Sequence, residues 1–140
     1  MRVRLVKVLL MIVLVVIISG CSGPANNGLA KSETVKYTLY IGLNDKDTYS
    51  QKISTQEAEK KVNDIALKYV DGFTGCIGTG AFKDEKGMVT YENTLIYTFY
   101  SVTDEQMKRI MDELLKELNQ NAVLIDKQKV DYEFYKGQKL

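Results

Sequence analysis

Residues 89–118, VTYENTLIYTFYSVTDEQMKRIMDELLKEL, contain the pattern of a strand and then that of a helix in one continuous stretch. Between Val89 and Val102, threonine, tyrosine, isoleucine and phenylalanine are frequent, which is typical of a β-strand. After it, apolar residues recur every three or four positions, which is typical of an amphipathic helix. These residues are Met107, Ile110, Met111, Leu114 and Leu118. Thr103 followed by Gln106 is a capping-box pattern. The stretch therefore predicts a strand that leads directly into a helix.

The same order occurs earlier in the chain. Residues 35–43 alternate between apolar and polar side chains, which predicts a strand. Ser54 followed by Glu57 is a second capping pattern. Apolar residues follow at helical spacing, so we predict a helix from about Thr55 to Val70.

Four further segments complete the predicted domain. Residues 73–82, FTGCIGTGAF, are interpreted as a glycine-rich strand, and 83–87 as a polar hairpin turn. Residues 119–121 end the second helix, and 122–135 alternate as a last strand, which we expect to be bulged near residues 127–128.

The resulting order, βαββαβ, is that of a ferredoxin-like α+β sandwich. Right-handed crossovers place both helices on one face of a four-stranded antiparallel sheet with strand order 4-1-3-2. The other face is predicted to be open. The side chains expected on it are Thr38, Tyr40, Thr94, Ile96, Thr98 and Tyr100.

The amino terminus has the features of an export signal. Residues 1–20 hold three basic and no acidic residues, and Val8 to Ile18 are all apolar. This apolar run is shorter than the roughly 20 residues that span a bilayer. Ile18-Ser19-Gly20-Cys21 resembles the lipobox of bacterial lipoproteins. The resemblance implies that Cys21 becomes the lipid-modified first residue of a mature protein on the extracytoplasmic side of the cell membrane. An ordinary secretory signal and a simple membrane anchor remain the alternatives.

We therefore predict a signal peptide over residues 1–20, a tether over 21–34 and a domain over 35–136. The full chain has 140 residues and a formal charge of +1, and the part after residue 20 has a charge of −2. Nucleic acid is therefore not an expected partner.

The composition also excludes much chemistry. The chain has no histidine and two cysteines, so the usual general base is missing and a zinc cage cannot form. We expect no cofactor and no metal site. Gly75, Gly78 and Gly80 do not form a phosphate-binding pattern, because no helix follows them. Cys76 is expected to be a buried strand residue, with pairing to another chain as the alternative.

Several carboxylates are candidates for acid–base work or for binding calcium. They are Asp45, Asp47, Asp84, Glu85 and Glu92. The run from Asn44 to Asp47 lacks the spacing of a calcium loop, so a solvated loop is favoured. Glu92 differs because it lies in the middle of a predicted strand, between Tyr91 and Asn93. On the open face, its carboxylate would point into whatever covers the sheet.

The domain also resembles a family of small secreted bacterial proteins that is known only as a domain of unknown function. The matching segments are Tyr37–Leu43, Asp71-Gly72-Phe73-Thr74, Gly78, Gly87, and Glu92 with Leu95 and Ile96. Where the family has an aromatic residue after its second-strand glycine, this chain has Ala81 before Phe82. The resemblance covers about residues 37–135 and implies no activity. It draws attention to Asp71, Thr74 and Glu92 as a shared site or as shared turn chemistry.

Two functions are consistent with these observations. The first is a non-enzymatic lipoprotein that binds a small ligand or a protein through the open sheet face. Its expected face residues are Tyr40, Asp71, Thr74, Glu92, Thr98 and Tyr100, and its expected partners include a second copy or another envelope protein. The second is a small envelope enzyme that uses Glu92 and a tyrosine in acid and base roles.

Overall fold

A computed structural model describes residues 32–83 and 87–137. The predicted signal peptide, Cys21, most of the tether and the carboxylates Asp84 and Glu85 lie outside the described residues. The elements in chain order are β1 (Ser32–Gly42), α2 (Thr55–Ala66), β2 (Thr74–Lys83), β3 (Val89–Phe99), α3 (Asp104–Glu117) and β4 (Leu124–Tyr132).

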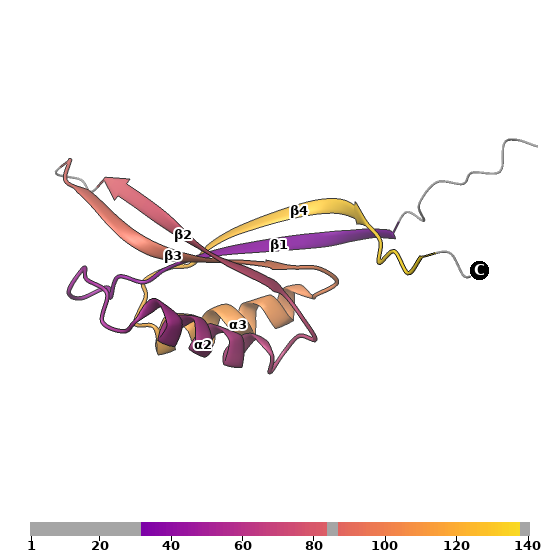
Figure 1. The fold of residues 1–140 in the computed structure, drawn as a ribbon, viewed down its shortest axis with the longest axis horizontal. Coiled ribbons are helices and arrows are strands. Elements are labelled where there is room, and N and C mark those ends of the chain that lie inside the picture. Colours follow the sequence, from indigo (N-terminus) through magenta and orange to yellow (C-terminus); the bar gives the residue numbers. More distant parts are fainter. Residues whose placement is uncertain (1–31, 84–86, 138–140) are drawn as a thin grey trace, which may run out of the picture. The chain divides into compact units, whose positions relative to one another are not determined.

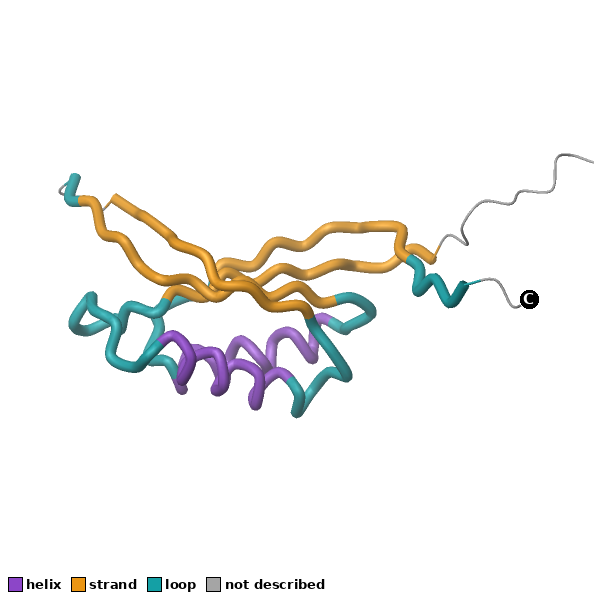
Figure 2. The backbone as a smooth tube through the Cα atoms, in the orientation of Figure 1, coloured by secondary structure: helices purple, strands orange, loops and turns teal. Residues whose placement is uncertain are grey.

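The strands form one antiparallel sheet in the order β2-β3-β1-β4. Helices α2 and α3 lie side by side on the same face of this sheet, and no described element covers the other face (Figures 1 and 2). The ferredoxin-like α+β architecture and the strand order 4-1-3-2 are confirmed.

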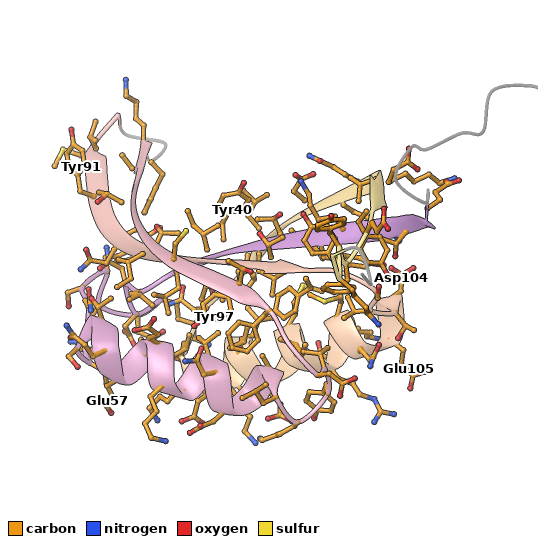
Figure 3. The ribbon with its side chains drawn as sticks, turned by 45° about the vertical axis from the view of Figure 1, so that its right-hand side comes forward. Tyr40, Glu57, Tyr91, Tyr97, Asp104 and Glu105 are labelled. Carbon is orange, nitrogen blue, oxygen red and sulfur yellow. The ribbon has the colours of Figure 1, made fainter. Side chains whose placement is uncertain are left out.

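The register between β1 and β3 decides which side chains face the helices. Tyr37 lies opposite Phe99, Leu39 opposite Tyr97 and Ile41 opposite Leu95, and all six are buried against the helices. The alternate residues point to the open face, as predicted. Figure 3 shows the contrast: Tyr97 lies between the sheet and α2, whereas Tyr40 projects from the opposite side.

Both helices begin at the predicted caps. The Ser54 hydroxyl accepts a hydrogen bond from the Glu57 amide at 3.1 Å, and Thr103 with Gln106 forms a complete capping box. Helix α2 ends at Ala66, four residues before the predicted end. The Lys68 and Tyr69 amides donate to carbonyls three residues back, which tightens the chain into a turn before β2.

Several strand ends differ from the prediction. Strand β1 begins at Ser32, so three residues assigned to the tether pair with β4. Strand β3 ends at Phe99, because Ser101 adopts a positive φ of 57° that no strand continues through. Strand β4 is shorter than predicted at both ends.

The predicted bulge in β4 is wrong. Pairing with β1 is regular from Ser32↔Tyr132 to Tyr40↔Leu124. The polar Lys127 occupies the helix-side face without a bulge because its ammonium group binds the Asp104 carboxylate at 2.6 Å.

The sheet is longer than the helical layer. Strands β2 and β3 continue beyond Gly42, where β1 ends, as a two-stranded arm (Figure 1). Among the described residues, no helix is long and apolar enough to cross a membrane.

Candidate functional site

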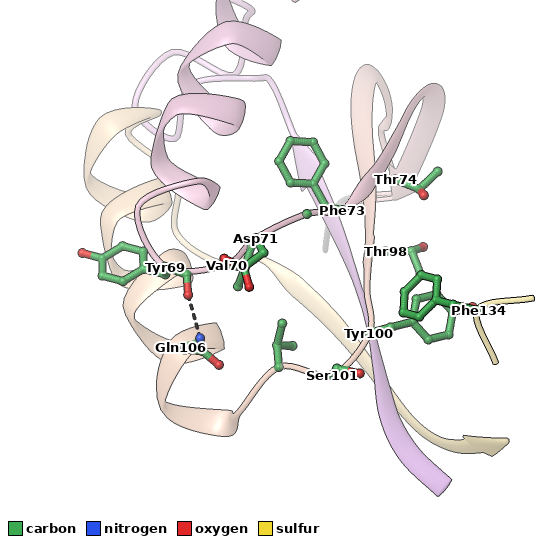
Figure 4. A pocket seen from close by; sticks show the side chains of 12 residues that line it. Tyr69, Val70, Asp71, Phe73, Thr74, Thr98, Tyr100, Ser101, Gln106 and Phe134 are labelled. Carbon is green, nitrogen blue, oxygen red and sulfur yellow. Dashed lines mark hydrogen bonds between the residues drawn. The ribbon is translucent and has the colours of Figure 1, made fainter. Parts of the chain in front are cut away.

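A cavity of about 460 Å³ lies at the end of the sheet, where β3 leads into α3 and the turn after α2 leads into β2 (Figure 4). Its walls come from four separate parts of the chain. The lining residues are Tyr69, Val70, Asp71, Gly72, Phe73, Thr74, Thr98, Tyr100, Ser101, Val102, Gln106 and Phe134.

Four residues predicted for the binding face line this cavity. Thr74 and Thr98 are paired across β2 and β3 on the open face of the sheet. Tyr100 follows the end of β3, and Asp71 lies in the turn that precedes β2. The register of the sheet therefore brings these four side chains to one place.

The lining of the cavity carries a negative charge and no positive one. Asp71 is exposed and forms no hydrogen bond or ion pair with another described residue. No lysine or arginine is among the lining residues. The hydroxyl groups of Thr74, Thr98 and Ser101 and the amide of Gln106 complete the polar lining.

Aromatic rings form the wall on the side of β4. The ring centroids of Tyr100 and Tyr132 are 5.8 Å apart, as are those of Tyr132 and Phe134. The Ser101 and Tyr132 hydroxyl groups are hydrogen-bonded to each other. Figure 4 shows Tyr100 and Phe134 on one side of the cavity and Asp71 on the side of the turn before β2.

Gln106 connects α3 to that turn. Its side-chain NH₂ donates to the Tyr69 carbonyl at 2.6 Å, while its side-chain oxygen accepts from the Thr103 amide at 2.8 Å. Phe73 anchors the next part of the turn to the core, because its ring packs on Tyr97 with centroids 4.9 Å apart. Together these contacts hold the cavity wall that carries Asp71.

Sequence reasoning missed part of this site. The sequence predicts only a capping role for Gln106, and it predicts that Phe134 belongs to the last strand. No signal in the sequence indicated that the chain after Tyr132 returns to the end of β3.

The other two predicted face residues lie elsewhere. Tyr40 belongs to a cross-strand row on the open face with Leu124, Ile96 and Cys76. Glu92 also lies on this face, but its carboxylate covers Gly42: a Cβ atom at Gly42 would lie 2.5 Å from Oε2 of Glu92. Glu92 is four residues from Ile96, which is about 13 Å along a strand.

The expectation for Cys76 is wrong. Its side chain is exposed because β2 is an edge strand and Cys76 points to the open face. The glycines of β2 serve close packing, as Gly75 shows: a Cβ atom there would lie 3.1 Å from Cζ of Tyr97.

The run from Asn44 to Asp47 lies in a loop, and Asp45 has a structural role in it. The Asp45 carboxylate accepts hydrogen bonds from the Thr48 amide at 3.0 Å and from the Asn119 side chain at 2.7 Å. The bond from Asn119, then those from Thr48 and the Asp47 amide, lower the Asp45 pKa to about 2. No acidic or cysteine cluster able to hold a metal ion occurs in the described ranges.

Comparison with known proteins shows the family. Residues 36–134 match the family described as "Protein of unknown function (DUF3574)". The chain belongs to this family. No curated protein sequence matches it significantly.

Two solved structures are similar to the chain at low sequence identity. A phage SAM lyase in complex with S-methyl-5'-thioadenosine has a TM-score of 0.53 and 15% identity over 74% of this chain and 93% of its own. CutA from Synechococcus elongatus has a TM-score of 0.44 and 12% identity over 76% of this chain and 83% of its own. The lyase shares the architecture and indicates nothing about activity here.

Proposed function

We propose that this chain is a lipid-anchored extracytoplasmic protein that binds a small, positively charged organic molecule in the cavity at the end of its open sheet face. The anchor and the binding site are separate parts of the proposal. Each is supported by its own residues and is tested on its own.

The anchor is supported by the order of features at the amino terminus. A basic segment, an apolar run and Ile18-Ser19-Gly20-Cys21 follow one another in the order of a lipoprotein signal. Acyl chains stabilise membrane attachment by about 0.8 kcal/mol per buried CH₂, so two or three of them hold a protein firmly.

Metabolic labelling tests the anchor. Bacteria that express the full chain are grown with labelled palmitate, and we expect label and protein together in the membrane fraction. In the Cys21→Ser variant both the label and its membrane retention should be lost. Label that persists in this variant would contradict lipidation at Cys21.

The cavity carries the binding part of the proposal. Four of the six residues predicted for the binding face line this one cavity. Its volume of about 460 Å³ is within the usual range of small-molecule sites.

The charge of the lining indicates the class of ligand. Asp71 is an uncompensated carboxylate, and the rings of Tyr100 and Phe134 stand across the cavity from it. A cation is attracted both by a carboxylate and by the faces of aromatic rings. An anion would meet Asp71 with no lysine or arginine to offset the repulsion.

Thermal unfolding with two matched probes tests the binding part. Phenethylamine and phenylacetate have the same ring and opposite charges. We expect phenethylamine to raise the unfolding midpoint of the full chain in mild detergent and phenylacetate to leave it unchanged. At ten times the dissociation constant the stabilisation is about 1.4 kcal/mol.

Two variants make this test specific. Asp71→Asn should abolish the shift, whereas Asp112→Asn, which removes the same charge from the exposed surface of α3, should keep it. Equal stabilisation by both probes, or an unchanged shift in Asp71→Asn, would contradict the proposal.

The enzymatic alternative gains no support from the arrangement. Glu92 lies eight positions before Tyr100 in the chain, and no tyrosine hydroxyl in the described part of the chain is hydrogen-bonded to it. Acid–base catalysis by a carboxyl and a tyrosine requires both groups within reach of one substrate.

A further inference from the structure

Strand β2 has an unusually unprotected edge. It lies at one end of the sheet order, and within residues 32–83 and 87–137 only β3 pairs with it. An edge strand presents unpaired N–H and C=O groups that can accept a further strand. Natural proteins block such pairing with charges, proline, bulges or very short edge strands.

Strand β2 has none of these protections along most of its length. It is ten residues long, and its first nine residues, TGCIGTGAF, include no charged residue and no proline. Its pairing with β3 is regular from Thr74↔Thr98 to Lys83↔Val89, so it has no bulge.

The opposite edge of the same sheet is different. Strand β4 carries four charged residues within its nine positions. They are Asp126, Lys127, Lys129 and Asp131. The contrast shows that protection is absent from one edge in particular and is not a general feature of this sheet.

We propose that the edge of β2 pairs with a second copy of this chain, so that the sheet continues from one protomer into the next. The charge pattern favours a copy over a foreign strand. The uncharged residues 74–82 bring no like charges opposite each other when they meet the same residues of a second copy. They also have no charge with which to select a different protein.

Exposed apolar side chains near this edge also support pairing with a second copy. Ile77 is 55% exposed and Tyr91 72% exposed. Both are on the helix-side face, Ile77 opposite Leu95 and Tyr91 within the arm formed by β2 and β3. The helices do not extend under this arm (Figure 1). A neighbouring sheet joined at β2 would bury Ile77 and bring apolar surface to the arm.

Sedimentation equilibrium of the full chain in mild detergent tests the proposal. One chain has a mass of 15.9 kDa, and we expect a mass of at least two chains. The double variant Ile77→Lys/Thr79→Lys places two charges on the edge strand and should give the mass of a single chain. The apolar amino terminus is unchanged in this variant, so its own association cannot explain the difference.

Thr90→Lys is the matched control. Thr90 lies on β3, an inner strand, and faces the open side opposite Phe82. It should keep the oligomer if the contact is the edge of β2, and lose it if copies associate through the open face. Circular dichroism of each variant checks that the fold is intact.

Hydrogen exchange of the unmodified chain provides a second measurement. Raising the protein concentration should slow amide exchange in residues 74–83, because pairing protects the outer amides of β2. A single-chain mass at all concentrations, an oligomer that resists the two lysines, or one that Thr90→Lys dissociates would each overturn the proposal.

Discussion

Gly75 shows how a single residue makes room for the core. It lies directly opposite Tyr97, whose ring is buried and whose hydroxyl donates to the Asn63 side chain at 2.5 Å. Burial raises the pKa of Tyr97 to about 12, as expected for a phenol held away from water. The ring cannot move away from a new methyl group without leaving the core.

Gly75→Ala is therefore expected to lower the free energy of unfolding by about 1–3 kcal/mol, the usual cost of overpacking. Gly72→Ala is the matched control, because a Cβ atom at Gly72 would have no atom within 4 Å. Urea unfolding of both variants provides the comparison. A loss at Gly72 as large as that at Gly75 would show that close contact with Tyr97 is not the cause.

The lowered pKa of Asp45 predicts how the free energy of unfolding depends on pH. Its pKa is lowered from 3.8 to about 2 in the folded chain, chiefly by the hydrogen bond from Asn119. The unfolded chain therefore binds more protons in this interval, and part of the stability is lost as the pH falls from about 4 to 2. Above pH 4 this contribution is fully present.

Asp45→Asn should remove this part of the pH dependence, so that its unfolding free energy falls less steeply between pH 4 and 2. Asp112→Asn should keep the slope of the unmodified chain, since it changes the same charge outside the loop. Chemical unfolding at several pH values measures both slopes. Identical slopes for Asp45→Asn and the unmodified chain would contradict the assigned role of the loop.

At the scale of elements, Gln106 combines two roles. Its side-chain oxygen caps α3, and its NH₂ group holds the carbonyl of Tyr69. Gln106→Glu keeps the capping oxygen but has no donor for Tyr69 when ionised. We expect α3 to keep its start and the turn before β2 to loosen.

Hydrogen exchange can separate these two effects. Amides of residues 69–73 should exchange faster in Gln106→Glu, while those of α3 should be unchanged. In Thr103→Ala the opposite pattern is expected, with a stability loss of about 1 kcal/mol from the missing cap. Faster exchange throughout α3 in Gln106→Glu would show that capping is its main role.

The elements themselves could be predicted because their signals are local. Alternation identified β1, and the frequency of threonine, tyrosine, isoleucine and phenylalanine identified β3. The capping patterns at Ser54 and Thr103 located both helix starts. Their ends depend on contacts far away in the chain. Lys127 stays in a regular strand because Asp104 from α3 binds it, and no pattern within β4 contains that information.

At the scale of the whole molecule, the candidate site could be predicted in part. Thr74 and Thr98 are 24 positions apart, and the hairpin register brings them together as the predicted topology required. Phe134 was not predicted for the site, because its position depends on how the chain continues after β4. Cys76 is exposed on the open face although a buried position was expected, even though the predicted strand order already put its strand at the sheet edge.

Both proposals use the ends and edges of one sheet. The cavity lies at the end where β3 leads into α3, and the unprotected edge of β2 begins with Thr74, which also lines that cavity. The helices cover only the middle of one face, so the sheet retains surface for a ligand and for a second copy.

Binding in the cavity is tested most directly by nuclear magnetic resonance of the ¹⁵N-labelled full chain in detergent micelles, titrated with phenethylamine. We predict saturable shifts of the backbone amides of Asp71, Thr74 and Ser101, with little change in the amides of helix α2. The absence of shifts around Asp71, or larger shifts in α2, would contradict the account.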